Sequence, residues 1–184
     1  MFKDKSRIKG KLTVTVFGPD GQIKRRPQNF IQKFLGLPGS KMISVNHNIV
    51  TDEGDALVAD QMSMTPARQK LDNTNGFVQV GTNWTGTTPK TNTACNTGTG
   101  TPEVMDATYP KQKGAFSAAN DNVTQYRATF EAGDLNATIT EAALLNNVTP
   151  ASADCLAYAQ VTPSAVVTTA DTLQVDWEIT FLGA

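Results

Sequence analysis

The segment from Asp171 to Phe181 constrains the fold most, because apolar and polar residues alternate along it without a break. Its apolar positions are Leu173, Val175, Trp177, Ile179 and Phe181. Side chains of a β-strand point alternately to opposite faces of a sheet, whereas a helix would scatter these apolar residues around its circumference. The segment is therefore predicted to be a strand with one face in a core and the other facing water or a partner chain.

A strand this apolar needs a second apolar sheet face to cover it. We therefore predict a mainly β fold, an antiparallel β-sandwich for which a jelly-roll-like arrangement is one option. Alternating residues on either side of the turn signal Gly18-Pro19-Asp20-Gly21 predict an N-terminal hairpin over residues 11–26. One short helix is expected over residues 52–63, where Thr51 is a suitable N-cap and acidic residues fill the first turn. The apolar-rich stretch Phe30–Leu37 fits either a short helix or a strand.

The chain of 184 residues is long enough for one domain with its own core. We expect residues 1–9 to form a charged N-terminal arm and residues 10–184 to form a single β-sandwich domain. Residues 82–113 are rich in Thr, Asn, Gly and Pro and have almost no apolar periodicity, so a long loop is predicted there. Within it, Trp84 either folds back on the core as a loop anchor or makes an exposed contact with a partner or a sugar.

The formal net charge of -1 is not that of a polyanion-binding protein, so nucleic acid is not expected as a partner. No segment is long and apolar enough to cross a membrane, and the charged N-terminus is not followed by the apolar region of a signal peptide. Synthesis in the cytoplasm and no membrane partner are therefore expected. Cys95 and Cys155 are expected to be reduced thiols, and a bridge between them would require an oxidising environment.

The residue patterns favour a protein that is not an enzyme and has no catalytic residues, metal or other cofactor. The single histidine, His47, has no His/Cys cluster or nucleophile motif around it, so a structural role is predicted. A hydrolase with carboxylate catalysis is an alternative; Asp176 and Glu178 would be its test residues, although the polar face of a strand also explains them. The basic cluster Lys24-Arg25-Arg26 is either a solvated strand edge that discourages edge pairing or a phosphate site.

Three local patterns, in this order along the chain, resemble structural proteins of tailed bacteriophages. They are a charged start with a turn at Asp20-Gly21 leading to Ile49–Gly54, the run Val80-Gly81-Thr82 that opens a Gly/Thr-rich loop, and Ile139-Thr140-Glu141 followed by the strands 156–159 and 173–179. The set is similar to small β-rich virion proteins of heads, tails and fibres, and to N-terminal modules of tail-collar fibres. The chain departs from the pattern at Asn83-Trp84, which interrupts the expected Gly-Thr-Gly run, and at Ala142-Ala143.

The resemblance implies a virion structural protein made in the host cytoplasm, first of all a capsid decoration or cement protein that stabilises the shell through repeated weak contacts. Its partners would be other virion proteins, with the major capsid protein first, and it would form a homo-oligomer, with a trimer as the first guess. The alternative is a tail, collar or fibre component for host attachment, a carbohydrate-binding β-sandwich with Trp84, Tyr109 and Tyr126 on one exposed platform. The residues expected at partner contacts are Lys5, Arg7, Lys24, Arg25, Arg26 and Trp84.

Overall fold

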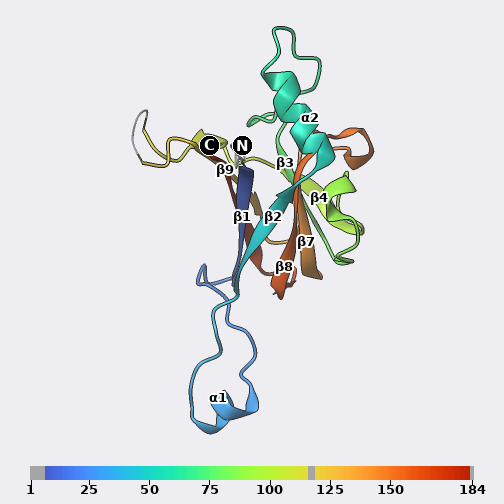
Figure 1. Ribbon diagram of the computed structural model, residues 1–184. Helices are drawn as coiled ribbons and strands as arrows, with labels where there is room; N and C mark the ends of the chain where they lie inside the picture. The colour runs from blue at the N-terminus through green and yellow to red at the C-terminus, as the bar shows by residue number, and fades with distance from the viewer. Residues whose placement is uncertain (1–6, 116–118, 183–184) are drawn as a thin grey trace.

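The computed structural model describes residues 7–115 and 119–182 (Figure 1). Nine strands, two α-helices and two short 3-10 helices are found in this part of the chain. In chain order they are β1 (Arg7–Phe17), α1 (Phe30–Phe34), β2 (Ile43–Val50), α2 (Asp52–Gln61), β3 (Phe77–Gly81), η1 (Pro89–Thr91), β4 (Gly98–Val104), β5 (Lys111–Gln112), β6 (Val123–Phe130), β7 (Ala137–Leu145), η2 (Pro150–Ser152), β8 (Cys155–Val167) and β9 (Thr172–Leu182). Across these two described ranges, no helix has the length and apolar character needed to span a membrane.

All nine strands belong to one antiparallel sheet in the order β4-β3-β7-β8-β2-β1-β9-β6-β5. The sheet curls into a half-barrel, and its two ends approach each other: the backbone N–H of Asp106, just after β4, donates to the carbonyl oxygen of Arg127 in β6 at 2.9 Å. The prediction of a mainly β fold is confirmed, but the prediction of a two-sheet sandwich is wrong.

The correction has a simple physical origin in the core. Leu173, Val175, Trp177 and Ile179 of β9 are fully buried, as their alternation predicts. The residues that cover them include Val78 of β3 and Leu144 of β7, which belong to the other half of the same curled sheet and to the same core cluster. Alternation predicts which face of a strand is buried, but it carries no information on whether the covering face comes from a second sheet.

The hairpin predicted over residues 11–26 forms only around its turn, where the N–H of Lys24 donates to the carbonyl of Val16 at 2.8 Å. Strand β1 pairs with β2 on one side and with β9 on the other, so that Val14 lies opposite both Ser44 and Val175. After the turn, Ile23 and Arg25 make only isolated bridges, and the chain leaves the sheet. Residues 7–9, expected in the N-terminal arm, belong to β1, and residues 1–6 lie outside the described residues.

Helix α2 confirms the helix predicted at residue 52, with the Thr51 hydroxyl accepting the N–H of Gly54 at 3.0 Å. Gly54, which lowers helix propensity, is explained by packing: a Cβ built there would lie 2.1 Å from the carbonyl oxygen of Leu156 in β8. The glycine therefore lets the helix pack closely on the sheet. The stretch Phe30–Leu37, whose composition fits either a short helix or a strand, contains the second helix, α1.

The stretch 82–113, expected to be one long loop, contains the strand β4, the short strand β5 and the turn η1. Strand β4 lies at the edge of the sheet and is mostly exposed or half-buried, so it has no buried face that would demand an apolar period. Residues 82–97 instead supply Trp84 and Cys95 to a second, smaller apolar cluster with Leu145 and Tyr158 of β7 and β8.

Candidate functional site

The candidate site is the projecting loop, residues 24–42, which connects β1 to β2. It extends far from the sheet and carries α1 at its outer end (Figure 1). At its base the two arms of the loop pair with each other: the N–H of Met42 donates to the carbonyl of Lys24 at 2.7 Å, and the N–H of Arg26 donates to the carbonyl of Ser40 at 2.8 Å. The two arms therefore form a paired stalk at the base, residues 24–26 with 40–42, and separate beyond it on the way to α1 (Figure 1).

Basic side chains fix the stalk to the body. The Lys24 ammonium forms an ion pair with the Asp171 carboxylate at 2.5 Å, and the Arg26 guanidinium donates to the carbonyl of Ser164 at 2.6 Å. Arg25 donates across the stalk to a backbone carbonyl on its other arm at 2.9 Å. Burial opposes ionisation of Asp171, but hydrogen bonds from Lys24 and from residue 168 outweigh it and lower its pKa. The direction of the loop is thus set by bonds to residues distant in sequence.

Helix α1 has defined ends although it is only five residues long. The Asn29 side chain accepts the N–H of Gln32 at 2.8 Å and the Gln32 side chain accepts the N–H of Asn29 at 3.1 Å, which is a capping box. At the other end Gly36 has a φ of 64° and the N–H of Leu37 donates to the Gln32 carbonyl at 2.8 Å, as in a Schellman motif. Local bonds therefore order a helix that would be marginal alone.

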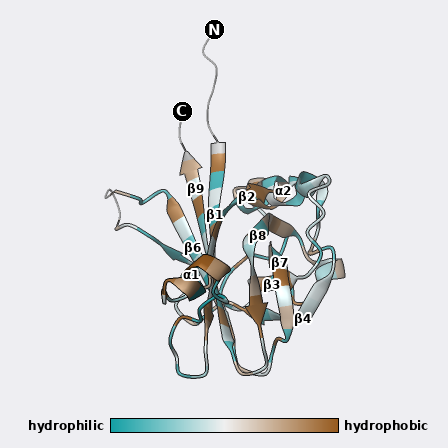
Figure 2. Ribbon diagram, turned by 90° about the horizontal axis from the view of Figure 1, so that it is seen from below, coloured by the Kyte–Doolittle hydropathy of each residue, from teal (hydrophilic) through white to brown (hydrophobic). Residues whose placement is uncertain are grey.

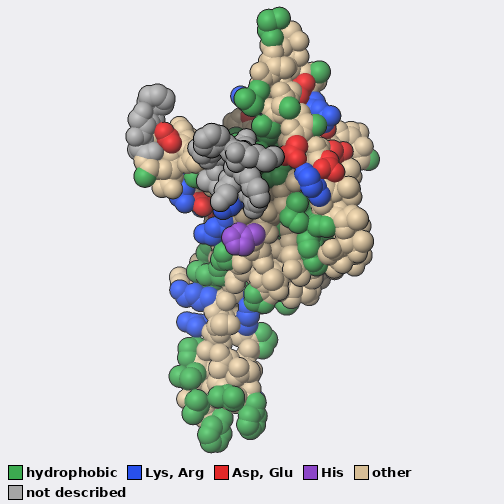
Figure 3. Space-filling model, viewed as in Figure 1, with side chains coloured by type: hydrophobic (Ala, Val, Ile, Leu, Met, Phe, Trp, Pro, Cys, Tyr) green, Lys and Arg blue, Asp and Glu red, His purple; other side chains and the backbone are tan. Residues whose placement is uncertain are grey.

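The outer end of the loop exposes large apolar side chains, which we call the apolar tip. They are between 49% and 84% exposed and comprise Phe30, Ile31, Phe34, Leu35 and Leu37. No residue of α1 is buried. Figure 2 shows α1 in the hydrophobic colour, and Figure 3 shows apolar side chains gathered over the whole end of the loop, with Lys and Arg between it and the body. A contiguous apolar patch on a soluble protein usually marks an interaction site.

Trp84, predicted either as an anchor or as an exposed contact, is a loop anchor. Its ring stacks on Tyr158, with 4.9 Å between the centroids. Beside this stack lies Glu141 of β7, which is fully buried and for which the sequence predicts no role beyond its place in the run Ile139-Thr140-Glu141. One carboxylate oxygen accepts the N–H groups of Asn83 at 3.2 Å and Thr97 at 3.0 Å.

The other Glu141 oxygen accepts the N–H of Asn96 at 2.9 Å and the hydroxyl of Tyr158. Burial and the hydrogen bond to Glu141 raise the pKa of Tyr158, which therefore remains a donor. Since the four donors saturate the carboxylate, Glu141 holds residues 82–97 on the sheet and has no lone pair left for a substrate.

Comparisons of the chain with protein-family models, with curated proteins and with solved structures found no match. The resemblance to tailed-phage virion proteins therefore stays a prediction, and function must be argued from the geometry of the molecule.

The aromatic platform expected for a carbohydrate-binding role is not formed. Tyr109 and Tyr126 are both buried in the main core cluster, whereas Trp84 belongs to the cluster on the other face of the sheet. Burial raises the pKa of Tyr126 to about 12. The ring of Tyr109 is covered by Lys111 and Arg127, whose cationic groups lie 4.4 Å and 5.0 Å from its centroid.

The carboxylates considered for a hydrolase lie on the outer face of β9. Asp176 accepts a hydrogen bond from Arg127 at 2.6 Å, and Glu178 pairs with Lys113 at 2.7 Å. Burial opposes ionisation of Glu178, but hydrogen bonds from Lys113 and Gln125 outweigh it, so its pKa is lowered. A general acid needs the opposite shift, so this geometry does not favour carboxylate catalysis.

The other predicted residues are dispersed. Lys5 lies outside the described residues, and Arg7 opens β1 opposite Leu182. His47 is exposed on β2, and within residues 7–115 and 119–182 no group of three or more His, Cys, Asp or Glu could hold a metal. Cys95 and Cys155 are buried in the smaller cluster without a bridge, and burial raises the pKa of both thiols.

Proposed function

We propose that this chain is a non-enzymatic structural protein of a tailed-phage virion, a capsid decoration or cement protein that binds neighbouring subunits through its projecting loop. The observation that carries the proposal is the apolar tip. A loop that is braced at its base and capped at its end, yet buries none of its helix against its own chain, is suited to contact another surface.

The energetics suit repeated weak contacts. Fully burying one large, fully exposed apolar side chain contributes roughly 1.5–3 kcal/mol, so the five side chains of the apolar tip, which are 49% to 84% exposed, offer about 5–10 kcal/mol. Association costs about 4–15 kcal/mol in lost freedom, and this range largely offsets the gain. A single tip therefore binds weakly, whereas many copies on one particle hold together through multivalency.

The charge of the projecting loop does not favour nucleic acid as the partner. The loop holds no Asp or Glu, and its cationic residues are Lys24, Arg25, Arg26, Lys33 and Lys41. The first three are bonded to acceptors at the base. An apolar protein surface on a neighbouring subunit of the particle fits the tip better, and the major capsid protein is the first candidate for the shell protein to which the chain attaches.

The test uses particles of the phage that encodes the chain. The double variant Phe30→Ser/Phe34→Ser, supplied in place of the wild type, should be lost from purified particles. The matched control Val148→Ser, at an exposed apolar side chain away from the loop, should be incorporated normally. Normal incorporation of the tip variant would contradict docking through the loop.

Gold-labelled antibody against the chain then identifies the site on the wild-type particle. Label spread evenly over the head supports a decoration or cement role. Label confined to the tail or to one vertex would replace that role by a collar or fibre position, which is the alternative implied by the resemblance. Absence of the chain from particles by mass spectrometry would contradict a virion role.

A further inference from the structure

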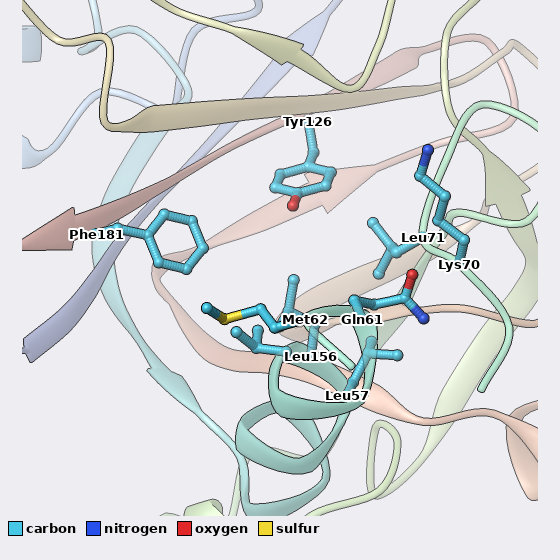
Figure 4. A pocket seen from close by; sticks show the side chains of 9 residues that line it. Leu57, Gln61, Met62, Lys70, Leu71, Tyr126, Leu156 and Phe181 are labelled. Atoms are coloured by element: carbon cyan, nitrogen blue, oxygen red, sulfur yellow. The ribbon is translucent and has the colours of Figure 1, made fainter. Parts of the chain in front are cut away.

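A second apolar feature lies beneath α2, in the body of the molecule. It is a pocket of about 310 Å³ lined by Leu57, Val58, Gln61, Met62, Lys70, Leu71, Tyr126, Leu156 and Phe181. Figure 4 shows these side chains converging from the helix, the strands and the segment after α2 on one open space. Phe181 and Met62 remain exposed although both are large and apolar. Nothing in the described part of the chain fills this space.

The pocket and the apolar tip lie at opposite ends of the molecule. In Figure 1, α2 is at one end of the sheet, and α1 hangs beyond the other. Because Lys24 and Arg26 fix the stalk to the body, the tip cannot reach the pocket of its own chain. Two copies of the chain, however, can bring one tip to one pocket.

The size of the pocket matches two phenyl rings. A protein cavity of about 150 Å³ holds one benzene molecule, so about 310 Å³ has room for two. The tip presents two such rings, Phe30 and Phe34, which are 84% and 80% exposed. They are four residues apart in α1, so they lie on the same face of the helix.

The pocket lining itself contains one charged residue, the cation Lys70, but the helix above it has the charge opposite to that of the projecting loop. Helix α2 contains Asp52, Glu53, Asp55 and Asp60 and no Lys or Arg. Lys90 pairs with Asp52 and Asp55, which leaves the helix with a net negative charge. The projecting loop is basic, with Lys33 in the last turn of α1 and no acidic residue anywhere.

We propose that the projecting loop of one copy inserts Phe30 and Phe34 into the pocket beneath α2 of a second copy. This rests on the proposed function of the loop as the docking element and names its partner. The contact joins different surfaces on the two copies, so it either closes reciprocally between two copies or repeats head to tail, into a ring if the rotation closes and into a filament if it does not. A homo-oligomer then forms before or during attachment to a particle.

The experiment measures association of the purified full-length chain by analytical ultracentrifugation over a range of concentrations. Phe30→Ser/Phe34→Ser should be monomeric. Met62→Lys places a cation at the mouth of the pocket against the basic loop, and should weaken association at least tenfold. Met62 is 82% exposed, so this change leaves folding intact. Met64→Lys is the matched control, because Met64 is 97% exposed and does not line the pocket; it should change association less than twofold.

Mixing the tip variant Phe30→Ser/Phe34→Ser with the pocket variant Met62→Lys tests directly whether a tip binds a pocket. The tip variant retains an intact pocket and Met62→Lys retains an intact tip. Association of either variant with itself lacks one partner surface. An equimolar mixture can pair only the intact tip of one with the intact pocket of the other, and this restores a 1:1 complex.

Two outcomes would overturn the proposal. One is a wild type that stays monomeric at every accessible concentration; the other is association that Met62→Lys does not weaken. If the tip variant is nevertheless lost from particles, the proposed function stands and the loop docks on a different protein. If the tip variant enters particles normally, the proposed function fails whatever the chain does in solution.

Discussion

Replacing Glu141 by glutamine should release residues 82–97 from the outer face of the sheet. In the wild type, one oxygen of this buried carboxylate accepts the N–H groups of Asn83 and Thr97, and the other accepts the N–H of Asn96 and the hydroxyl of Tyr158. Glutamine has the same shape but only one accepting oxygen. Its amide nitrogen must therefore face at least one backbone N–H group, and two donors cannot bond each other.

The magnitude follows from the number of bonds affected. In the better of the two glutamine orientations, the carbonyl oxygen keeps Asn83 and Thr97, while Asn96 faces the amide nitrogen. Leaving a fully buried N–H unpaired costs about 1–3 kcal/mol, and because the hydrogen bond of Asn96 is only part-buried, about 1–2 kcal/mol applies here. The two retained bonds change from a charged to a neutral acceptor, which loses roughly 0.5–1.5 kcal/mol each. The expected loss of unfolding free energy for Glu141→Gln is about 2–5 kcal/mol, a large share of a typical domain stability of about 5–15 kcal/mol.

The assay is urea denaturation combined with native-state hydrogen exchange. Glu141→Gln should lower the unfolding free energy, and the backbone N–H groups of Asn83, Asn96 and Thr97 should exchange much faster, while those of β9 follow the global change. Glu131→Gln, at an exposed glutamate, is the control and should stay within about 0.5 kcal/mol of the wild type. If Glu141→Gln is as stable as this control and the three N–H groups keep their protection, the assigned role of Glu141 is refuted.

Three further predictions concern other parts of the fold. Gly54→Ala should lower stability by about 1–3 kcal/mol in thermal denaturation, because the added methyl group collides with β8. Helix propensity acts in the opposite direction and favours alanine by about 1 kcal/mol. The control Ala59→Gly, at an exposed position of the same helix, should show this propensity cost alone. Asp171→Asn should lower stability by about 1–3 kcal/mol at pH 7. The pKa of Asp171 is lowered on folding, so its contribution is complete above the unfolded value of about 4 and is lost as the pH falls through the folded value; the gap between wild type and Asp171→Asn should close in acid. Cys95 and Cys155 should react with a thiol reagent only when the chain unfolds, because burial raises the pKa of both thiols.

The elements predicted well from sequence are those whose signal is local. The alternation in β9 predicts the burial of Leu173, Val175, Trp177 and Ile179, although the fifth apolar residue of the pattern, Phe181, is 38% exposed. The cap at Thr51 predicts the start of α2. The four consecutive apolar residues 142–145 are a local sign of a strand buried on both faces, and in β7 Ala142 and Leu144 face the main core while Ala143 and Leu145 face the smaller cluster. In each case the burial or the helix start is determined by a residue pattern within a single element.

The features that sequence reasoning missed depend on partners distant along the chain. Strand β1 pairs with β9, which lies more than 150 residues further along the chain. The turn signal after β1 does not indicate that β1 pairs with this distant strand. Glu141 looks like any polar residue of a strand, and only the fold brings the loop around residue 96 over it. The apolar tip did carry a signal: apolar residues between Asn29 and Gly36, a cap at each end, form a helix too short to bury a face of its own.

Under the proposed function, Lys24, Arg25 and Arg26 contribute to binding by bracing the projecting loop, whether or not they also contact the partner. Their sequence, three consecutive cations, suggests side chains that face water or a partner. In the fold they instead bond to a carboxylate and to backbone carbonyl oxygens of the same chain. Ordering the backbone of one residue costs roughly 1–2 kcal/mol of conformational entropy. In an unbraced loop this cost would be subtracted from the free energy of docking. Because the bonds at the base form when the chain folds, the apolar tip meets its partner already oriented. We infer that the three cations strengthen docking by holding the loop in one direction.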